Sequence, residues 1–578
     1  MSNSTENPKE KLGSHKESYI SVSIAHDVAA RSESSLEAGT RTPDKESVLE
    51  SQGQIGAPTL RLPFPRLISA YLCLSALYFI SQLDINSVAT ALPTISSSLN
   101  AGNTITWTGT AYVMGQTAFQ PLYGRFSDIF GRKVVLMACI GFLIGGDLLC
   151  GFAQNYIWLY VCRAISGIGG GGINSLVQIT ASDLVSLRDR GKYQGILSCA
   201  TGLGASTGPF IAAAIMTNSS NGWRWIFWVP PILATVCVAL TWVWLPLKPV
   251  TGRWSEKIQK IDWLGLFTVV IGVLFLIIAI NSGGSTFPWA NPIIISLLVL
   301  GGTFIILFGI VEVWIAKIPM IPLRLFTKLS TSTIFLQSVL YNGVWQINLY
   351  FLPMYFQDVR GYDPLKNAML MLSLLLTQSV SALVAGQIIS KIGRQVSNYH
   401  VPGPVLFGGL ALWTLGTGLK ILFSRTTPVS VYVISLIIEG VGIGCNLQPA
   451  LVALQALSRP EDRAVATSTR NMMRMLGSVF GLAIATTVQF QFMKLGLSDT
   501  VPPALRSRVI EGLWQRGEPG SEMWESAILD AKLNGVHAVF IMTVPMMALC
   551  LLSCFFIPNI RLNGDPKTSD NDANKEQK

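Results

Sequence analysis

The chain has 578 residues, of which 50% are hydrophobic and only 13% charged, and its mean hydropathy is +0.47. A soluble chain of this length has about a quarter of its residues charged, so the composition indicates a polytopic membrane protein instead. The net charge of +10 does not indicate nucleic-acid binding, because the Lys and Arg residues lie in short loops between apolar runs.

Residues 1–65 are rich in Ser, Glu and Lys, which is typical of a disordered tail, and they lack the apolar core of a cleaved signal peptide. A membrane-spanning helix needs about 20 mostly apolar residues. The sequence contains fourteen such runs, in the windows 67–93, 105–123, 134–153, 157–181, 193–216, 223–245, 263–281, 292–314, 331–356, 367–390, 402–423, 430–456, 464–490 and 535–557.

The basic residues predict the orientation of these helices, because Lys and Arg are enriched in cytoplasmic loops. A cytoplasmic N-terminus places most Lys and Arg of the short loops inside, while the short outer loops keep few, such as Arg360 and Lys366. Fourteen spans then put the polar tail 558–578 in the cytoplasm as well. The inner residues include Arg132, Lys133, Arg188, Arg190, Lys192, Lys257, Lys260, Arg324, Lys391 and Arg463.

An internal repeat divides the chain into two related halves. The stretch GRFSDIFGR at 124–132 aligns with GQIISKIGR at 386–394. Further pairs are separated by 273 positions: Gly167, Gly169 and Gly171 from Gly440, Gly442 and Gly444, and Gly204 and Gly208 from Gly477 and Gly481. Many secondary transporters consist of such repeats. We therefore expect six-helix bundles at 66–246 and 329–557, joined by two linker helices within 247–328.

The stretch GRFSDIFGRK between the second and third helices is a candidate cytoplasmic gate. Gly124 and Gly131 permit a tight turn and close helix approach, and Arg132 and Lys133 hold the turn inside. We interpret Asp128 as an acceptor for a neighbouring helix N-terminus or an inner-loop Arg, favouring the outward-facing state. The alternative is a solvated loop of mixed charge.

This stretch resembles the signature turn of the major facilitator superfamily. The segments LDINSVATALPTI (83–95), RAISGIGGGG (163–172) and GLGASTGPFIAAA (202–214) resemble motifs of its fourteen-helix drug:proton antiporter branch in fungi. The resemblance implies an all-α polytopic fold of two six-helix bundles plus two extra central helices. It also implies proton-coupled efflux of small organic compounds (drugs, toxins or metabolites) by alternating access.

The resemblance places Gly204, Gly208 and Pro209 in the antiporter motif of the fifth helix. From the residues alone, the three read as a device for close packing and kinking. The sequence departs from the family pattern in three ways: Ala212 and Ala213 replace a glycine pair, Pro230 replaces a frequent Asn, and Asp147 replaces a small uncharged residue.

Ionisable residues inside a membrane are functional candidates by default. Asp84, Asp147, Arg163 and Glu439 are therefore assigned to proton coupling or to the cavity. At 1.5 Å per residue, Asp147 and Arg163 reach similar depths, so we expect an ion pair, with a purely structural bridge as the alternative. A cavity made acidic by Asp84, Asp147 and Glu439 would favour cationic cargo.

The ninth helix is unusually polar and aromatic, which predicts that it faces a cavity rather than lipid. Tyr341, Asn342, Trp345 and Gln346 are the candidate substrate residues. Arg470 and Arg474 lie one turn apart near the inner end of the thirteenth helix, where we expect contact with a loop or a lipid phosphate.

The expected function is proton-coupled efflux, with protons, a small-molecule substrate and the lipid bilayer as partners, and a monomeric state. The alternatives are a dedicated transporter, such as a vacuolar basic amino acid or siderophore transporter, and a non-transporting nutrient sensor. No phosphate-binding loop or HExxH motif is found, so we expect no enzyme, cofactor, metal or nucleic acid. The plasma membrane is favoured over the vacuolar membrane. The Asn218 sequon lies in a loop too short to favour glycosylation.

Overall fold

A computed structural model describes most of the chain between Pro63 and Pro558. The two tails beyond these residues and the Asn218 sequon lie outside the described residues. The described ranges are 63–217, 222–245, 253–283, 287–316, 318–392, 403–497, 501–510, 514, 516 and 522–558.

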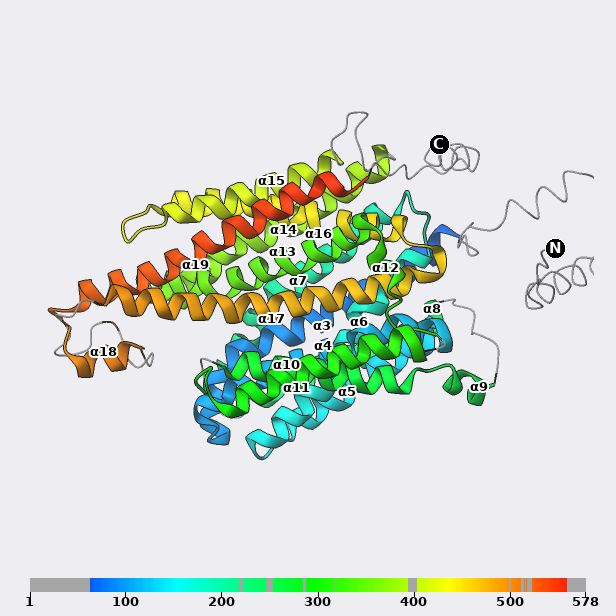
Figure 1. Cartoon of the computed structure of the whole chain (residues 1–578), viewed down its shortest axis with the longest axis horizontal. Helices are drawn as coiled ribbons and strands as arrows, with labels where there is room; N and C mark the ends of the chain where they lie inside the picture. The colour runs from blue at the N-terminus through cyan, green and yellow to red at the C-terminus, as the bar shows by residue number, and fades with distance from the viewer. Residues whose placement is uncertain are drawn as a thin grey trace, which may run out of the picture. The chain divides into compact units, whose positions relative to one another are not determined.

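The described residues form helices and no strand (Figure 1). The first six long helices are α3 (Phe64–Leu99), α4 (Trp107–Phe130), α5 (Arg132–Gly151), α6 (Tyr156–Asp183), α7 (Arg190–Thr217) and α8 (Trp223–Trp244). Two linker helices follow, α10 (Trp263–Ser282) and α11 (Pro292–Ile310). The last six are α13 (Leu329–Met354), α14 (Pro364–Ile392), α15 (Pro404–Leu419), α16 (Val429–Leu457), α17 (Arg463–Gly496) and α19 (Glu525–Ser553).

Short helices lie between or beside the long ones. They are α9 (Trp254–Gln259), α12 (Arg324–Thr327) and α18 (Pro503–Ile510), with the single-turn segments η1 (Gly102–Thr106), η2 (Val311–Ile315), η3 (Tyr355–Val359), η4 (Lys420–Leu422), η5 (Pro460–Asp462) and η6 (Cys554–Phe556).

Each of the fourteen predicted windows falls on one long helix, so the predicted helical architecture is confirmed. By length and composition, eleven of these helices are apolar enough to cross a membrane. The other three, α4, α6 and α13, are more polar because each directs amide side chains toward the interior of the molecule. The largest difference in bounds is at α19, which begins at Glu525, ten residues before its window.

The repeat glycines pack in the same way in both halves, as expected for two related bundles. A Cβ added at Gly204 or Gly208 would meet α3 backbone, 2.5 Å from Phe79 O or 3.1 Å from Leu83 O. A Cβ at Gly477 or Gly481 would meet α13 backbone, 2.2 Å from Val339 O or 2.6 Å from Gly343 Cα. These glycines therefore allow α7 and α17 to pack closely on the first helix of their halves. Pro209 lies inside α7, directly after the second of its two packing glycines.

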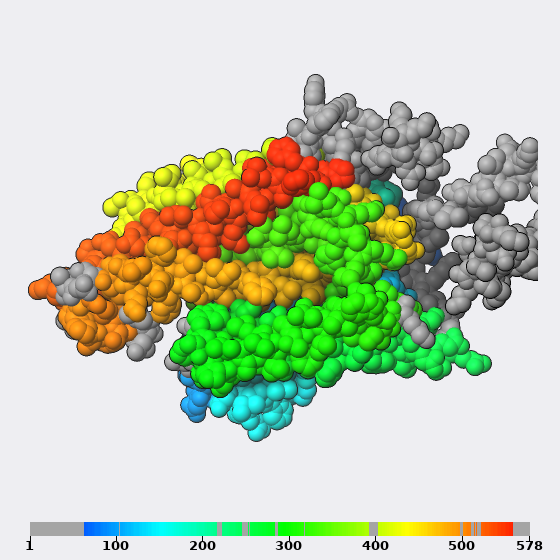
Figure 2. Space-filling model, in the orientation of Figure 1, coloured from blue at the N-terminus to red at the C-terminus, as the bar shows by residue number. Residues whose placement is uncertain are grey.

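The linker helices α10 and α11 pack together, and α10 also contacts α4 and α17, one helix from each bundle. Figure 2 shows them beside α17 on the same face. Their exit is fixed by Glu312, whose Oε1 accepts the N–H groups of Met320 at 2.7 Å and Ile321 at 3.2 Å. Arg125 of α4 donates to Pro319 O at 3.0 Å from its Nε. The linker is thereby tied to the N-terminal bundle.

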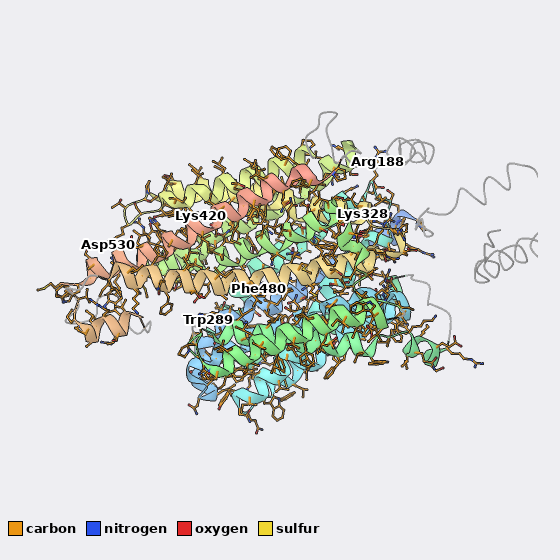
Figure 3. The ribbon with its side chains drawn as sticks, viewed as in Figure 1. Arg188, Trp289, Lys328, Lys420, Phe480 and Asp530 are labelled. Carbon is orange, nitrogen blue, oxygen red and sulfur yellow. The ribbon has the colours of Figure 1, made fainter. Side chains whose placement is uncertain are left out.

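Labelled residues identify the two ends of the bundle. Arg188 and Lys328 lie at one end in Figure 3, together with the start of α3 and the end of α19 in Figure 1. Trp289 and Asp530 lie at the other end. We call the end that carries Arg188 and the turn 124–133 the basic end, and the other the opposite end.

Candidate transport site

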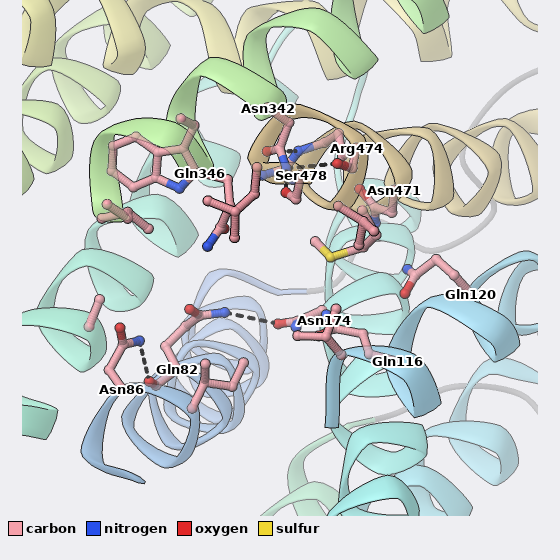
Figure 4. A pocket seen from close by; sticks show the side chains of 18 of the residues that line it. Gln82, Asn86, Gln116, Gln120, Asn174, Asn342, Gln346, Asn471, Arg474 and Ser478 are labelled. Carbon is pink, nitrogen blue, oxygen red and sulfur yellow. Dashed lines mark hydrogen bonds between the residues drawn. The ribbon is translucent and has the colours of Figure 1, made fainter. Parts of the chain in front are cut away.

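A cavity of about 360 Å³ lies between the two bundles (Figure 4). Its lining comes from α3, α4, α6, α7, α10, α13, α14 and α17, so both halves and the linker contribute. Among the described lining residues, Arg474 carries the only formal charge. Amide side chains dominate the polar lining: Gln82, Asn86, Gln116, Gln120, Asn174, Gln178, Asn281, Asn342, Gln346 and Asn471.

The ninth predicted helix, α13, contributes Asn342, Trp345 and Gln346 to the cavity, as its polarity suggested. Leu349 lines it as well, because these four residues share one helix face. Tyr341 is not among the lining residues. Its position, one residue before Asn342, turns the buried phenol toward α17, where its hydroxyl accepts a hydrogen bond of 2.8 Å from Arg470 Nη2.

Arg474 lies far from any loop, which differs from the expectation for this residue. It is eleven residues into α17, about 16 Å from the helix start. Its Nε donates to Asn342 Oδ1 at 3.2 Å, and the Asn342 amide donates to Arg474 O at 2.8 Å. The Asn342 amide also donates to Ser478 Oγ (Figure 4). The guanidinium is thus held at the cavity wall and not at a lipid phosphate.

Three of the predicted intramembrane residues form one buried cluster. Arg163 Nη1 lies 2.9 Å from Asp84 Oδ1 and 3.2 Å from Asp147 Oδ1, which confirms the expected pair between α5 and α6 and adds Asp84 of α3. All three side chains are at most 1% exposed. The guanidinium also lies 4.4 Å from the centre of the Tyr112 ring. Two carboxylates here face one guanidinium.

The fourth predicted residue, Glu439, belongs to a second buried cluster. Its Oε1 accepts from Lys420 Nζ at 3.0 Å, Asn348 Nδ2 at 2.7 Å, and the side chains of Trp413 and Thr417, each at 3.2 Å. Sequence reasoning missed Lys420, because a lysine at the end of an apolar run usually extends to the membrane surface. The available signal was its position, 273 residues after Asp147 in the repeat.

These contacts change the expected chemistry of the cavity. Asp84, Asp147 and Glu439 are fully buried, each is paired with a base, and none is among the described residues that line the cavity. The acidic, cation-selective cavity expected from the sequence is therefore not what the structure contains. The cavity offers neutral amides and one guanidinium, which suit carboxylates and hydroxyl groups as ligands.

Residues of the predicted gate motif make contacts both within their own bundle and with the other bundle. Gly124 contacts the other bundle: an added Cβ would lie 2.7 Å from Ala464 O and 2.9 Å from Val465 Cα on α17. Asp128 instead pairs within its own bundle, 2.5 Å from Arg132 Nη1, and Arg132 Nε reaches Asp183 of α6 at 3.0 Å. The interbundle contact of the motif is therefore made by its glycine.

The turn itself is set by Gly131 and Lys133. Gly131 has a φ of +98°, a conformation that residues with a side chain rarely adopt. Lys133 follows at the start of α5, and its Nζ donates to Trp242 O at 2.7 Å and to Leu245 O at 3.2 Å. These bonds satisfy the last carbonyls of α8 and fix α5 against it.

Hydrogen bonds between described side chains join the two bundles on the basic-end side of the cavity. Gln448 Nε2 donates to Ser198 Oγ at 2.6 Å, and Arg190 Nη1 donates to Gln455 Oε1 at 3.2 Å. Asn471 of α17 donates to α6, reaching Ser175 Oγ at 3.1 Å and Gln178 Oε1 at 3.3 Å. The bundles are therefore closed together at the basic end.

Comparison with known proteins agrees with this architecture. Residues 74–482 match the model of the Major Facilitator Superfamily. The chain is 37% identical over 516 residues to Citrate exporter 1 of Yarrowia lipolytica, which covers 89% of this chain and 75% of that protein. It is 34% identical over 430 residues to Efflux pump dotC of Dothistroma septosporum, covering 74% of this chain and 72% of the relative.

Solved structures share the fold at low sequence identity. The proton:xylose symporter XylE aligns with a TM-score of 0.56 and 14% identity over 86% of this chain and 97% of its own. The human organic anion transporter MFSD10 aligns with a TM-score of 0.55 and 16% identity over 86% and 100%. With two six-helix bundles around a central cavity and a family match across both, this chain is a transporter of the major facilitator superfamily.

Proposed function

We propose that this protein is a proton-coupled exporter of small organic compounds that works by alternating access, and that its preferred cargo carries a carboxylate. The observation that carries this proposal is the cavity between the bundles, whose amide lining holds a single charged side chain, Arg474. A cavity closed toward one end and shared by two bundles is the geometry that rocking bundles require.

The cargo class follows from the donors in the cavity. A guanidinium presents paired N–H groups that match a carboxylate, and such charge-assisted bonds are about twice as strong as neutral ones. Amides such as Gln82, Gln116 and Asn174 add donors and acceptors for further carboxylate or hydroxyl oxygens. The relative named as a citrate exporter supports an organic acid as cargo.

Two other cargo classes are weighed against the same lining. Trp345, Leu349, Met475 and Leu482 give the cavity an apolar side, and with the relative named as an efflux pump they support neutral toxins or drugs as a second candidate. A basic amino acid is disfavoured, because Arg474 would repel a cation and no carboxylate is among the described lining residues.

The Asp84–Arg163–Asp147 cluster is the proposed proton site. With both carboxyls ionised the cluster carries one net negative charge in a dry interior, and one proton makes it neutral. Asp84 lies on α3 among the lining residues Gln82, Ile85 and Asn86. A change in its pairing with Arg163 therefore moves the helix face that the cargo contacts, which couples protonation to transport.

The predicted orientation assigns the structure to one state of the transport cycle. If the basic end is cytoplasmic, as the distribution of Lys and Arg predicts, the hydrogen bonds of Gln448 and Asn471 close the cytoplasmic side and the structure is outward-facing. In an exporter, this is the state that releases cargo to the outside and takes up protons along their gradient. This arrangement suits a monomer in the plasma membrane with both termini in the cytoplasm.

Transport by the purified protein in liposomes tests the proposal. Labelled citrate, lysine and a neutral apolar drug would be offered with and without an imposed pH gradient, to the wild type and to Arg474→Gln. We expect gradient-driven citrate transport that falls about tenfold or more in the variant, the loss expected for a charge-assisted bond. Arg459→Gln removes an exposed arginine at the basic end, outside the cavity, and should leave transport unchanged. Lysine transport, or citrate transport indifferent to Arg474, would contradict the proposed cargo.

A further inference from the structure

Helix α17 carries a line of arginines that leads from the basic end to the cavity. Arg463 is the first residue of the helix, Arg474 lines the cavity, and Arg470 lies between them. Their spacings of seven and four residues place the three on one face of an α-helix. Of the three, only Arg474 lines the cavity and has a role in the proposed function.

None of these arginines is paired with an acid in the part of the chain that the structure describes. Arg463 Nε donates to Gln455 O at 3.0 Å. Arg470 Nη2 donates to the Tyr341 hydroxyl at 2.8 Å and to Leu447 O at 2.7 Å. Arg470 is 1% exposed, and its Nε has no hydrogen-bond partner.

A buried guanidinium without a counter-ion is costly in a membrane protein, and such residues mark ion or substrate pathways. Other buried acids are already paired with other bases: Asp84 and Asp147 with Arg163, Glu439 with Lys420, and Asp462 with Arg324. Arg470 therefore has no counter-ion among these acids, and a ligand is a source of negative charge that fits its unpartnered Nε. A mobile anion can supply it and leave again, as a transported substrate must.

The residue next to Arg470 contacts the other bundle. Asn471 bonds to Ser175 and Gln178 of α6 across the bundle interface. When the bundles separate at the basic end, these bonds break and this stretch of α17 is uncovered. The opening that admits cargo from the basic end is thus the same movement that exposes Arg470.

We propose that Arg470 is a transit site for a small organic anion, occupied between the basic end and the cavity when the basic end is open. The inference rests on the proposed function and adds a second binding position to it. The ligand is a carboxylate-bearing anion, which the guanidinium holds by charge-assisted hydrogen bonds. From the opposite end the anion reaches Arg474 without passing this position.

Sidedness of transport tests the transit site. Labelled citrate would be offered to the full-length protein in inside-out and right-side-out vesicles, with Arg470→Gln, Arg470→Lys and the charge-matched control Arg459→Gln. We expect Arg470→Gln to raise the KM from the basic end about tenfold or more and the KM from the opposite end less than about twofold. Arg470→Lys should recover part of the loss, and Arg459→Gln should match the wild type. An equal effect on both sides, or none, overturns the transit site and leaves the proposed cargo standing.

A binding measurement separates this proposal from the proposed function. Thermal unfolding of the detergent-purified wild type and Arg470→Gln would be followed with citrate, with inorganic phosphate and with glycerol. Stabilisation by citrate or phosphate, but not glycerol, that weakens in the variant supports an anion site even if the vesicles transport only neutral compounds. Stabilisation by citrate but not by phosphate shows that the site prefers an organic anion. Transport of neutral compounds alone, with no stabilisation by either anion, overturns both proposals.

Discussion

Lys420 and Glu439 form, at 3.0 Å, the counterpart in the C-terminal bundle of the Asp147–Arg163 pair, with the signs of the two helices exchanged. The acid lies on α5 and the base on α6 in the first half, whereas the base follows α15 and the acid lies on α16 in the second. The first helix of each half adds a third partner, Asp84 from α3 and Asn348 from α13.

The third partner decides the charge of each cluster. Asp84 gives the first cluster two carboxyls against one guanidinium, while Asn348 leaves the second with one acid and one base. The second cluster is neutral as an ion pair and gains nothing from a proton. The first has one carboxyl in excess, which places the proposed proton site in the N-terminal bundle only.

Removing one partner of the Lys420–Glu439 pair should destabilise the protein. Lys420→Met leaves a buried, unpaired carboxylate, for which we expect a loss of about 3–5 kcal/mol, measured as a lower unfolding midpoint of the detergent-purified protein. The double variant Lys420→Met/Glu439→Gln removes both charges and should recover most of the loss. The single variant Glu439→Gln is measured as well. If the losses of stability in the two single variants simply add in the double variant, the pair does not interact as the structure indicates.

Asp147→Asn should uncouple transport from protons while preserving the fold. The variant leaves one carboxyl, Asp84, against Arg163, so the cluster is neutral without a proton. We expect the ratio of export rates with and without a pH gradient to fall to about one, while exchange of labelled for unlabelled cargo continues. Glu439→Gln is the comparison in the other bundle and should retain a response to the gradient in whatever protein folds. If the export rate of Asp147→Asn still responded fully to the pH gradient, the proton site would lie outside this cluster.

The fold could be predicted from the sequence because its signals are local or periodic. Apolar runs locate the helices, and the glycines at 167–171 and 440–444 reveal the repeat. The Asp147–Arg163 pair could also be predicted. The two residues lie on consecutive helices joined by a short turn, so counting residues from that turn shows that they reach similar depths in the membrane.

The cavity was not predictable in the same way, because it depends on how each helix is rotated about its axis. Arg474 was expected at a loop, yet α17 is 34 residues long and carries it to the centre of the molecule. Asp84 lies between cavity residues in the sequence but faces Arg163 instead. Such orientations are fixed by packing between helices distant in the chain, such as α3 on α7 through Gly204 and Gly208.

Gly124→Ala should weaken closure of the basic end. The added Cβ would lie within 3.0 Å of Ala464 O and Val465 Cα, which are backbone atoms that cannot rotate away, so α4 and α17 must separate. Overpacking of this kind typically costs about 1–3 kcal/mol, enough to shift an equilibrium between two transporter states. We expect longer distances between spin labels at Ser186 and Arg459, two exposed positions at the basic end of opposite bundles.

Gly141→Ala is the matched control for this change. It is also a helical glycine of the N-terminal bundle, on α5, but nothing lies within 4 Å of an added Cβ there. Its label distances and transport rate should equal those of the wild type, and its helix should be slightly more stable because alanine is the better helix former. Because the Gly124 contact bridges the bundles and the Asp128–Arg132 pair does not, Asp128→Asn should move the labels less than Gly124→Ala. If Asp128→Asn moved the labels more than Gly124→Ala, Asp128 and not Gly124 would be the residue of the motif that keeps the basic end closed.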